Sequence, residues 1–283
     1  MKIKRLLTAA ALCVVAFCSH GFAQTGAGFS ISRTKEMSKK MKFSPASTLV
    51  LDGAPNGSIS IESWDKNEAE VVAEITVWAN SEEDATRLAA IAGFYVDDSV
   101  TSLRVYSVGP NDKNYVKKVD KKLPKSLRSN PFRIDYKVRV PVYTDLRIDG
   151  GKGDFSLKGV EGIVSVNYIE SNAVISAPGG AMLLTIGSGS VDFSVTHSSW
   201  RGQGADIKIA KGDLIFRLPE DANVQIRGNA IGTGTIKIGY ENLEPRDRTE
   251  FTEKAIEGTA GNGGARFDLT VKEGDLRIVG LRE

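Results

Sequence analysis

The chain has 283 residues, and its 37 basic residues nearly balance its 35 acidic ones, which leaves a formal net charge of +2. A charge this close to zero gives no reason to expect a nucleic-acid partner. Both cysteines, Cys13 and Cys18, lie near the N-terminus, so the rest of the chain can form neither a disulfide nor a thiolate metal site.

Residues 1–23 have the layout of a secretory signal peptide. Three basic residues precede an apolar run of about a dozen residues, which is short for a transmembrane helix of roughly 20, and small residues precede the predicted cut after Ala23. The alternative is an uncleaved anchor. Cleavage would remove those three cations, change the formal charge from +2 to −1, and leave about 260 residues for one large or two modest domains. We therefore expect an exported protein that is periplasmic, located on the outer surface or secreted.

Residues 24–46 are predicted to be a leader or linker. They combine glycines and serines with a basic cluster at Lys35, Lys39, Lys40 and Lys42. A segment of this composition at a terminus is typical of a solvated tether.

Residues 47–140 are predicted to be an N-terminal β region. Apolar and polar residues alternate from Leu49 and Leu51 onward, and an Asn-Gly turn signal at positions 56–57 precedes further alternation over residues 71–77. Alternation with a period of two predicts strands with one buried face.

One short helix is predicted near residues 81–92. Ser81 is a favourable N-cap, three acidic residues follow in the first turn where the helix dipole stabilises them, and Gly93 could provide the left-handed C-terminal residue. The sequence predicts no other helix.

Residues 141–283 are predicted to be repetitive. A unit of the form Gly-x-apolar-x-apolar recurs, and residues 140–150 have a longer copy at residues 218–228, which equates Leu146 with Val224 and Ile148 with Ile226. Repeated short strands with glycine at the turns are typical of a β-solenoid, or β-helix, in which stacked turns share one core. The alternative for this all-β chain is a β-sandwich. The polar segment 241–264 is predicted to be a turn insertion.

Residues 56–79, the two copies above and the closing residues 272–280 resemble the "putative adhesin" family of exported bacterial domains, which is of unknown function and related to the head GIN domain of autotransporter-adhesin-like proteins. The resemblance extends over residues 47–280. It implies a β-solenoid, an export or envelope location and no established enzymatic activity. The family shares no catalytic motif, so the resemblance assigns no functional residue.

Catalytic and metal chemistry finds little support in the sequence. Beyond residue 23 there is one histidine, His197, which could form a Ser–His dyad only with an orienting acid such as Asp192 or Asp206. The glycine- and aspartate-containing segments do not repeat the calcium-binding pattern of solenoids. We expect no enzymatic activity, no metal and no cofactor.

Three aspartates recur just before strands of the repeat: Asp154, Asp213 and Asp275. A polysaccharide lyase or hydrolase would need such carboxylates in one groove. Aspartate also suits glycine-rich turns, and this is the role we predict for all three.

Residues 113–139 contain ten basic residues against Asp120 and Asp135. We predict that the stretch 110–130 is a loop and that it carries an anion-binding site, whose candidate residues are Lys117, Lys118, Lys121, Lys122 and Lys125. The interleaved aromatic residues Tyr115, Phe132 and Tyr136 would suit a membrane interface or a sugar face. The alternative is a solvated loop that keeps an edge strand from pairing.

The sequence thus predicts a non-enzymatic envelope or surface β-solenoid that acts as an adhesion-like or interaction scaffold. Its expected partners are an anionic envelope lipid, an acidic glycan or an envelope protein. The alternatives are a glycan-acting β-solenoid enzyme and an envelope-stress accessory protein.

Overall fold

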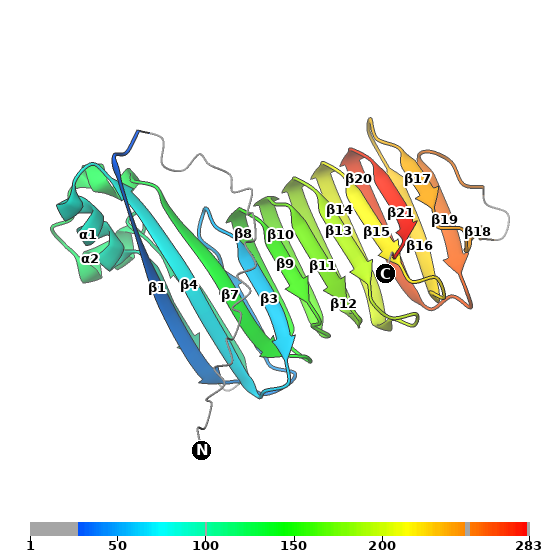
Figure 1. The fold of residues 1–283 in the computed structure, drawn as a ribbon, viewed down its shortest axis with the longest axis horizontal. Helices are drawn as coiled ribbons and strands as arrows, with labels where there is room; N and C mark the ends of the chain where they lie inside the picture. The colour runs from blue at the N-terminus through cyan, green and yellow to red at the C-terminus, as the bar shows by residue number, and fades with distance from the viewer. Residues whose placement is uncertain (1–27, 100, 247–249, 282–283) are drawn as a thin grey trace, which may run out of the picture.

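The computed structural model describes residues 28–99, 101–246 and 250–281, so the predicted signal peptide lies outside the described residues. The described residues form one sheet of 10 strands (sheet A), one sheet of 11 strands (sheet B), two α-helices and a 3-10 helix. The sheets run along an elongated molecule that carries its helices at one end (Figure 1). The prediction of an all-β fold is confirmed.

Both sheets are mixed. Antiparallel pairs lie at both ends of sheet B but only at the β1 end of sheet A, and the other pairs are parallel. Across sheet A the strands are β1 (Ile31–Lys42), β4 (Glu68–Ala79), β7 (Phe132–Pro141), β3 (Ile59–Trp64), β9 (Phe155–Lys158), β11 (Ala173–Ala177), β13 (Val191–Val195), β15 (Leu214–Leu218), β21 (Leu276–Gly280) and β17 (Ile236–Gly239). Across sheet B they are β18 (Leu243–Pro245), β19 (Ala255–Ala260), β16 (Val224–Ala230), β20 (Ala265–Glu273), β14 (Arg201–Lys211), β12 (Gly179–Ser188), β10 (Ile163–Glu170), β8 (Asp145–Lys152), β2 (Thr48–Asp52), β6 (Ser102–Val108) and β5 (Gly93–Asp98).

Residues 145–218, which we call the regular stack, alternate strictly between the two sheets. In sheet B, Leu146 lies beside Val164, and Val164 lies beside Met182, so each of these steps spans 18 residues. The first two steps in sheet A have the same length. Each strand therefore presents its apolar face at the same height as the strand before it.

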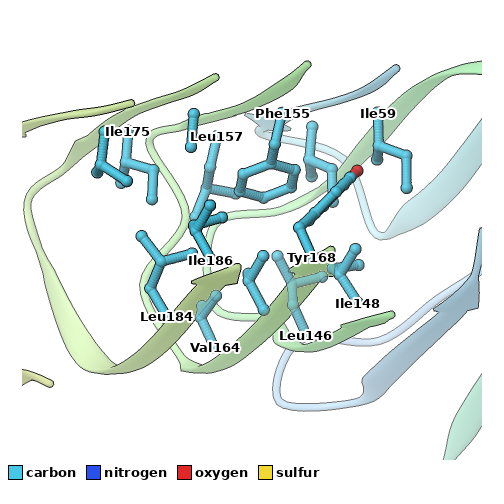
Figure 2. Close-up of a cluster of buried hydrophobic side chains, with 14 of the residues drawn as sticks. Ile59, Leu146, Ile148, Phe155, Leu157, Val164, Tyr168, Ile175, Leu184 and Ile186 are labelled. Carbon is cyan, nitrogen blue, oxygen red and sulfur yellow. The ribbon is translucent and has the colours of Figure 1, made fainter. Parts of the chain in front are cut away.

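The core lies between the sheets and is built from the alternating apolar residues of both (Figure 2). Phe155 and Leu157 come from sheet A, Ile148 and Tyr168 come from sheet B, and each is about fully buried. Burying one such side chain stabilises the fold by roughly 1.5–3 kcal/mol. The predicted inward positions Leu49 and Leu51 also belong to this core.

Glycines mark one corner of the stack, where the chain passes into sheet A. Gly153 has φ +150° and Gly212 has φ +132°, and a Cβ on Gly212 would lie 1.7 Å from the carbonyl oxygen of Gly189 in the neighbouring turn. A side chain at this corner would therefore collide with backbone, which explains why glycine recurs there.

The final two strands do not end the stack. Instead β20 lies between β14 and β16, and β21 lies between β15 and β17. When paired residues are followed from strand to strand across sheet B, Ile226 lies at the same height as Leu146. The sequence copy instead equates Ile226 with Ile148. That predicted equivalence is wrong by two residues. The inward face is still correct because side chains alternate with a period of two.

The helix predicted near residues 81–92 is present as α1 (Glu82–Ile91). Ser81 caps it as expected, since its Oγ accepts a hydrogen bond from the Asp84 N–H at 3.1 Å. The predicted glycine cap is wrong, because Ala92 ends the helix in an extended conformation and Gly93 begins β5.

Three other segments differ from the sequence prediction. Residues 31–42, expected in a linker, form β1 and pair with β4 along their whole length. The expected loop 110–130 contains a second helix, α2 (Lys113–Val119), and the 3-10 helix η1 (Lys125–Ser129). The expected insertion 241–264 supplies β18 and β19, which close one edge of sheet B. Within the described residues, no helix is long and apolar enough to cross a membrane.

Candidate anion-binding surface

The segment from α2 to η1 is held to the body of the protein by its apolar residues. Val116, Leu123 and Leu127 are buried in the core. Asp112 caps α2 by accepting hydrogen bonds from the backbone N–H groups of Asn114 and Tyr115 at 3.0 and 2.9 Å. With its apolar side fixed inward, the segment presents its other side to solvent.

Arg87 on α1 provides a second attachment point. Its guanidinium donates to both oxygens of Asp120, at 2.6 and 3.0 Å, just beyond the end of α2. The hydrogen bond from Arg87 lowers the pKa of Asp120, because it stabilises the ionised carboxylate. Asp120 is thereby engaged by α1 and by the backbone N–H of Lys122.

The solvent side of this segment carries six exposed lysines, which we call the lysine cap. They are the five predicted site residues and Lys113: Lys113, Lys117, Lys118, Lys121, Lys122 and Lys125. None of the six forms an ion pair with a carboxylate of the described residues, although such pairs occur elsewhere in the molecule. The structure thus leaves all five predicted residues exposed on the segment from α2 to η1.

The remaining cations of residues 113–139 do not join the lysine cap. Arg133 pairs with Asp135 at 2.6 Å, and Arg139 pairs with Glu70 on β4. Arg128 donates to the carbonyl of Leu123. The dense cationic stretch of the sequence is therefore split between the lysine cap and four other cations, of which Arg128, Arg133 and Arg139 have partners and Lys137 on β7 forms no ion pair with a carboxylate of the described residues.

The predicted aromatic contribution is wrong. Phe132 and Tyr136 lie in the core, with 5% and 1% of their surfaces exposed, and Tyr115 packs partly against that core. Burial raises the pKa of Tyr136, whose hydroxyl lies 2.7 Å from Ser107 Oγ. The exposed apolar residue beside the lysines is instead Val119, which is 50% exposed.

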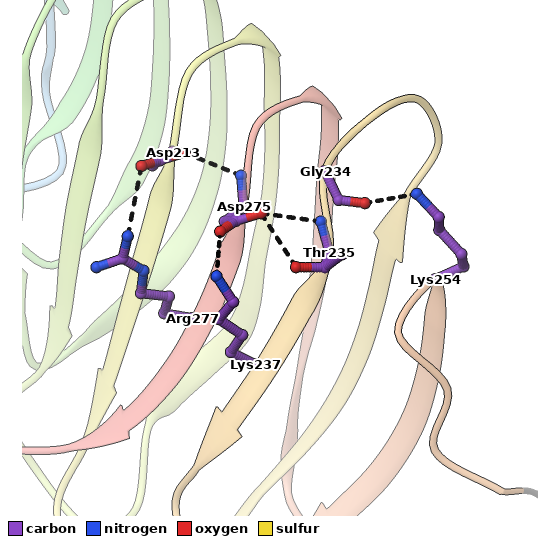
Figure 3. A network of polar contacts seen from close by, with 7 residues as sticks. All are labelled: Asp213, Gly234, Thr235, Lys237, Lys254, Asp275 and Arg277. Atoms are coloured by element: carbon purple, nitrogen blue, oxygen red, sulfur yellow. Dashed lines mark hydrogen bonds and ion pairs between the residues drawn. The ribbon is translucent and has the colours of Figure 1, made fainter.

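Two of the three recurring aspartates, Asp213 and Asp275, bond turn backbone as predicted, whereas Asp154 accepts a hydrogen bond from the Asn172 side chain at 3.4 Å. Asp213 accepts a hydrogen bond from the Asp275 N–H at 2.9 Å, and Asp275 accepts one from the Thr235 N–H at 3.0 Å, so each carboxylate bonds the backbone of the next turn (Figure 3). Lys237 Nζ lies 2.5 Å from Asp275, and its hydrogen bond is the main reason that the pKa of Asp275 falls to about 2.

The structure does not assemble the dyad considered for His197. His197 is exposed, and its Nδ1 lies 3.1 Å from Thr196 Oγ1. Asp192 is held by Arg217 through two hydrogen bonds of 2.7 and 2.9 Å, and Asp206 pairs with Lys208 at 2.6 Å. In the described part of the chain, no three histidine, cysteine or acidic side chains are grouped to hold a metal ion.

A second cationic cluster was not predicted. Trp64 at the end of β3 lies under Arg139, Lys66 and Lys40, with 4.8, 5.0 and 5.8 Å from the charged group to the ring centroid. Lys40 comes from β1, so this cluster could be found from the sequence only once residues 31–42 are recognised as a strand.

The sequence matches no family model, and no curated protein matches it. Among solved structures it is similar to a putative cell adhesion protein from Clostridium sporogenes, with 11% identity, a TM-score of 0.43, and coverage of 88% of this chain and 100% of that one. A putative adhesin from Bacteroides fragilis shares 11% identity over 87% of this chain and 97% of its own, with a TM-score of 0.29. A putative lipid binding protein from Parabacteroides distasonis shares 12% identity over 89% and 98%, with a TM-score of 0.27. These values assign the chain neither a family nor a function.

Proposed function

We propose that this chain is an exported, non-enzymatic interaction scaffold of the cell envelope or surface, and that the lysine cap contacts an anionic partner. The observation that carries the proposal is the presence of six exposed lysines within residues 113–125, none of which forms an ion pair with a carboxylate of the described residues. Like charges held this close repel one another, and an anionic surface relieves that repulsion.

We also propose that the two facing sheets form a β-solenoid. The alternation of residues 145–218 between the sheets and the repeated step of 18 residues support this description. A stack of this kind is long and laterally uniform, which suits a scaffold that holds a binding surface at one end.

The engagement of the corner aspartates supports the non-enzymatic proposal. Asp213 and Asp275 accept hydrogen bonds from backbone N–H groups of the next turn, and Asp192 is held by Arg217. Carboxylates bound in this way stabilise turns and pairs of strands. A glycan-acting enzyme would need such groups free to reach a substrate.

The chemistry of the lysine cap fits phosphate and carboxylate groups displayed at high density. Each lysine near an anionic membrane contributes about 1 kcal/mol, and the attraction falls off within a Debye length of roughly 8 Å at physiological salt. The proposed binding is therefore weak for one lysine, cumulative over six, and sensitive to salt.

The test is co-sedimentation of the protein, without its signal peptide, with anionic phospholipid vesicles and with an acidic polysaccharide, each at low and high salt. The test variant carries Lys117→Gln, Lys118→Gln, Lys121→Gln and Lys122→Gln. The matched control carries Lys152→Gln, Lys158→Gln, Lys208→Gln and Lys211→Gln, which removes the same charge from exposed positions of the regular stack.

We expect the wild type and the control to sediment with the anionic probe at low salt, and the test variant to remain in solution. The choice of probe separates lipid from glycan. Equal binding by the two variants, or no binding by the wild type at low salt, would mean that the segment is only solvated surface.

A further inference from the structure

The four edges of the two sheets are protected to very different degrees. β18 has three residues and ends in Pro245, and β17 has four residues and is covered by the segment whose Glu253 carbonyl accepts the Ile236 N–H at 2.8 Å. β5 has six residues. β1 has twelve. Short strands, proline, a covering loop and charged residues, lysine above all, are the usual means of blocking an edge, and of these β1 has only its lysines.

The open side of β1 can be assigned residue by residue. Lys42 lies beside Glu68, and the Phe43 N–H continues this ladder by donating to the Asn67 carbonyl at 3.1 Å. Antiparallel partners exchange hydrogen bonds at alternate residues, so the odd-numbered residues of β1 bond to β4. The N–H and C=O groups of the even-numbered residues, among them Ser38, point to the open side and have no partner in the described part of the chain.

The charges of β1 are strongly one-sided. Five basic residues face a single acidic residue, Glu36. Lys35, Lys39 and Lys42 form no ion pair with any carboxylate of the described residues, whereas Lys40 pairs with Glu70 at 3.4 Å. Lys35 is half-buried, and this burial lowers its pKa.

We infer that the open edge of β1 is a site for strand addition by an acidic, extended segment of a partner protein. The backbone groups of the even-numbered residues would hold the added strand, and the unpaired lysines would select carboxylates on it. A second copy does not fit the edge, because pairing β1 with itself would bring two strands of formal charge +4 together. The same lysines would reject neutral strands.

The first experiment uses a synthetic peptide of about the length of β1 in which glutamate alternates with valine or threonine. Its partner probe has the same sequence but is N-methylated at alternate residues, which removes the backbone donors along one side and keeps every charge. We expect fluorescence anisotropy to show affinity at least about tenfold higher for the unmethylated peptide. Equal affinity would mean that β1 attracts acidic chains by charge alone, and no binding at low salt would overturn the inference.

The second experiment compares Ser38→Pro with Ser38→Ala. Proline removes only a donor that faces the open side, so the fold should tolerate it as edge strands tolerate proline. We expect Ser38→Pro to lose peptide affinity about tenfold or more while Ser38→Ala keeps it. If Ser38→Pro bound the peptide as tightly as the wild type, the added strand would not lie along this edge.

Hydrogen exchange on the wild-type protein decides the matter even if the proline variant does not fold. Bound peptide should slow exchange at the even-numbered amides from Ser32 to Lys42 and leave the odd-numbered amides of β1 unchanged. Uniform protection or none would contradict strand addition. The lysine-cap variant should bind the peptide like the wild type, which separates this site from the proposed anionic surface.

Discussion

In the regular stack, residues 145–218, strands of four to eleven residues run parallel and repeat every 18 residues over the first two steps. At the N-terminal end, residues 31–141, β1, β4 and β7 are antiparallel neighbours of ten to twelve residues each, and the helices lie beside them. Corner glycines of the regular stack, such as Gly212, lie against the backbone of the neighbouring turn. At the N-terminal end Gly57 also lies against backbone, whereas Gly93 faces the flexible side chain of Met37.

The two regions also treat charge differently. In the regular stack, Arg217 pairs with Asp192 and Lys208 pairs with Asp206. The N-terminal end also contains ion pairs, such as Arg87 with Asp120, but the lysine cap and three lysines of β1 form none with a carboxylate of the described residues. Pairing within a strand layer stabilises the repeat, whereas unpaired charge on the end leaves capacity for a partner. This contrast locates the proposed functions at the N-terminal end.

The largest expected effect separates the two kinds of packing. Gly212→Ala in the regular stack would place a Cβ 1.7 Å from a backbone oxygen at φ +132°, whereas Gly93→Ala would meet Met37 Sδ at 2.8 Å. A methionine side chain can move and backbone cannot. We expect Gly212→Ala to cost about 4 kcal/mol or more and Gly93→Ala about 1 kcal/mol, measured by denaturant unfolding. Similar losses in both variants would remove this distinction.

The same contrast explains what the sequence could predict. Regular alternation identified the strands of the stack and buried residues such as Leu49, and a local capping signal identified α1. In β1 half-buried residues alternate with exposed ones, but many of them are charged. The sequence therefore showed no alternation of apolar and polar residues, and no strand was predicted there. The position of β20 and β21 inside the stack depends on contacts across up to 62 residues, as between Asp213 and Asp275, and no local pattern encodes it.

The candidate surface shows the same limit. The exposure of Lys117 and Lys118 followed from composition, because long charged side chains remain in water. The burial of Phe132 and Tyr136 did not, because residues adjacent in a cationic stretch alternate between the two faces of β7. The concentration of positive charge could be predicted from the local sequence. Which side chains face the core could be known only once the strand register was known.

The next effect concerns acid stability. The pKa of Asp275 is about 2 in the folded protein, below its ordinary value of 3.8. Its carboxylate therefore stabilises the fold above pH 3.8, and this stabilisation is lost as the pH falls toward 2. We expect the free energy of unfolding to fall less over this range in Asp275→Asn than in the wild type. Asp98→Asn is the matched control at the N-terminal end, because Asp98 is exposed and its carboxylate has no partner in the described part of the chain. Identical pH profiles for all three proteins would contradict the assignment.

A smaller effect of opposite sign is expected at two serines. Ser171 in the regular stack is 1% exposed, and its Oγ has no hydrogen-bond partner among the described residues. At the N-terminal end, Ser107 Oγ bonds the Asp52 carbonyl at 2.8 Å and the Tyr136 hydroxyl at 2.7 Å. We expect Ser171→Ala to stabilise the protein by about 1 kcal/mol and Ser107→Ala to destabilise it by about as much, measured by thermal unfolding. A loss in both variants would show that the Ser171 hydroxyl is satisfied in solution.

The smallest effect is on the stability of the lysine-cap variant, and its size depends on the salt concentration. Replacing Lys117, Lys118, Lys121 and Lys122 by glutamine removes repulsion between unpaired charges, so stability should rise by less than about 1 kcal/mol at low salt. Added salt screens the repulsion in the wild type, and the difference should vanish. Lys208→Gln in the regular stack should lower stability slightly at low salt, because it removes the pair with Asp206. Denaturant unfolding at two salt concentrations measures the expected gain in stability of the lysine-cap variant and the expected loss in Lys208→Gln. If the lysine-cap variant were less stable than the wild type at low salt, its lysines would have partners in the folded protein, and the contrast in charge between the two regions would not hold.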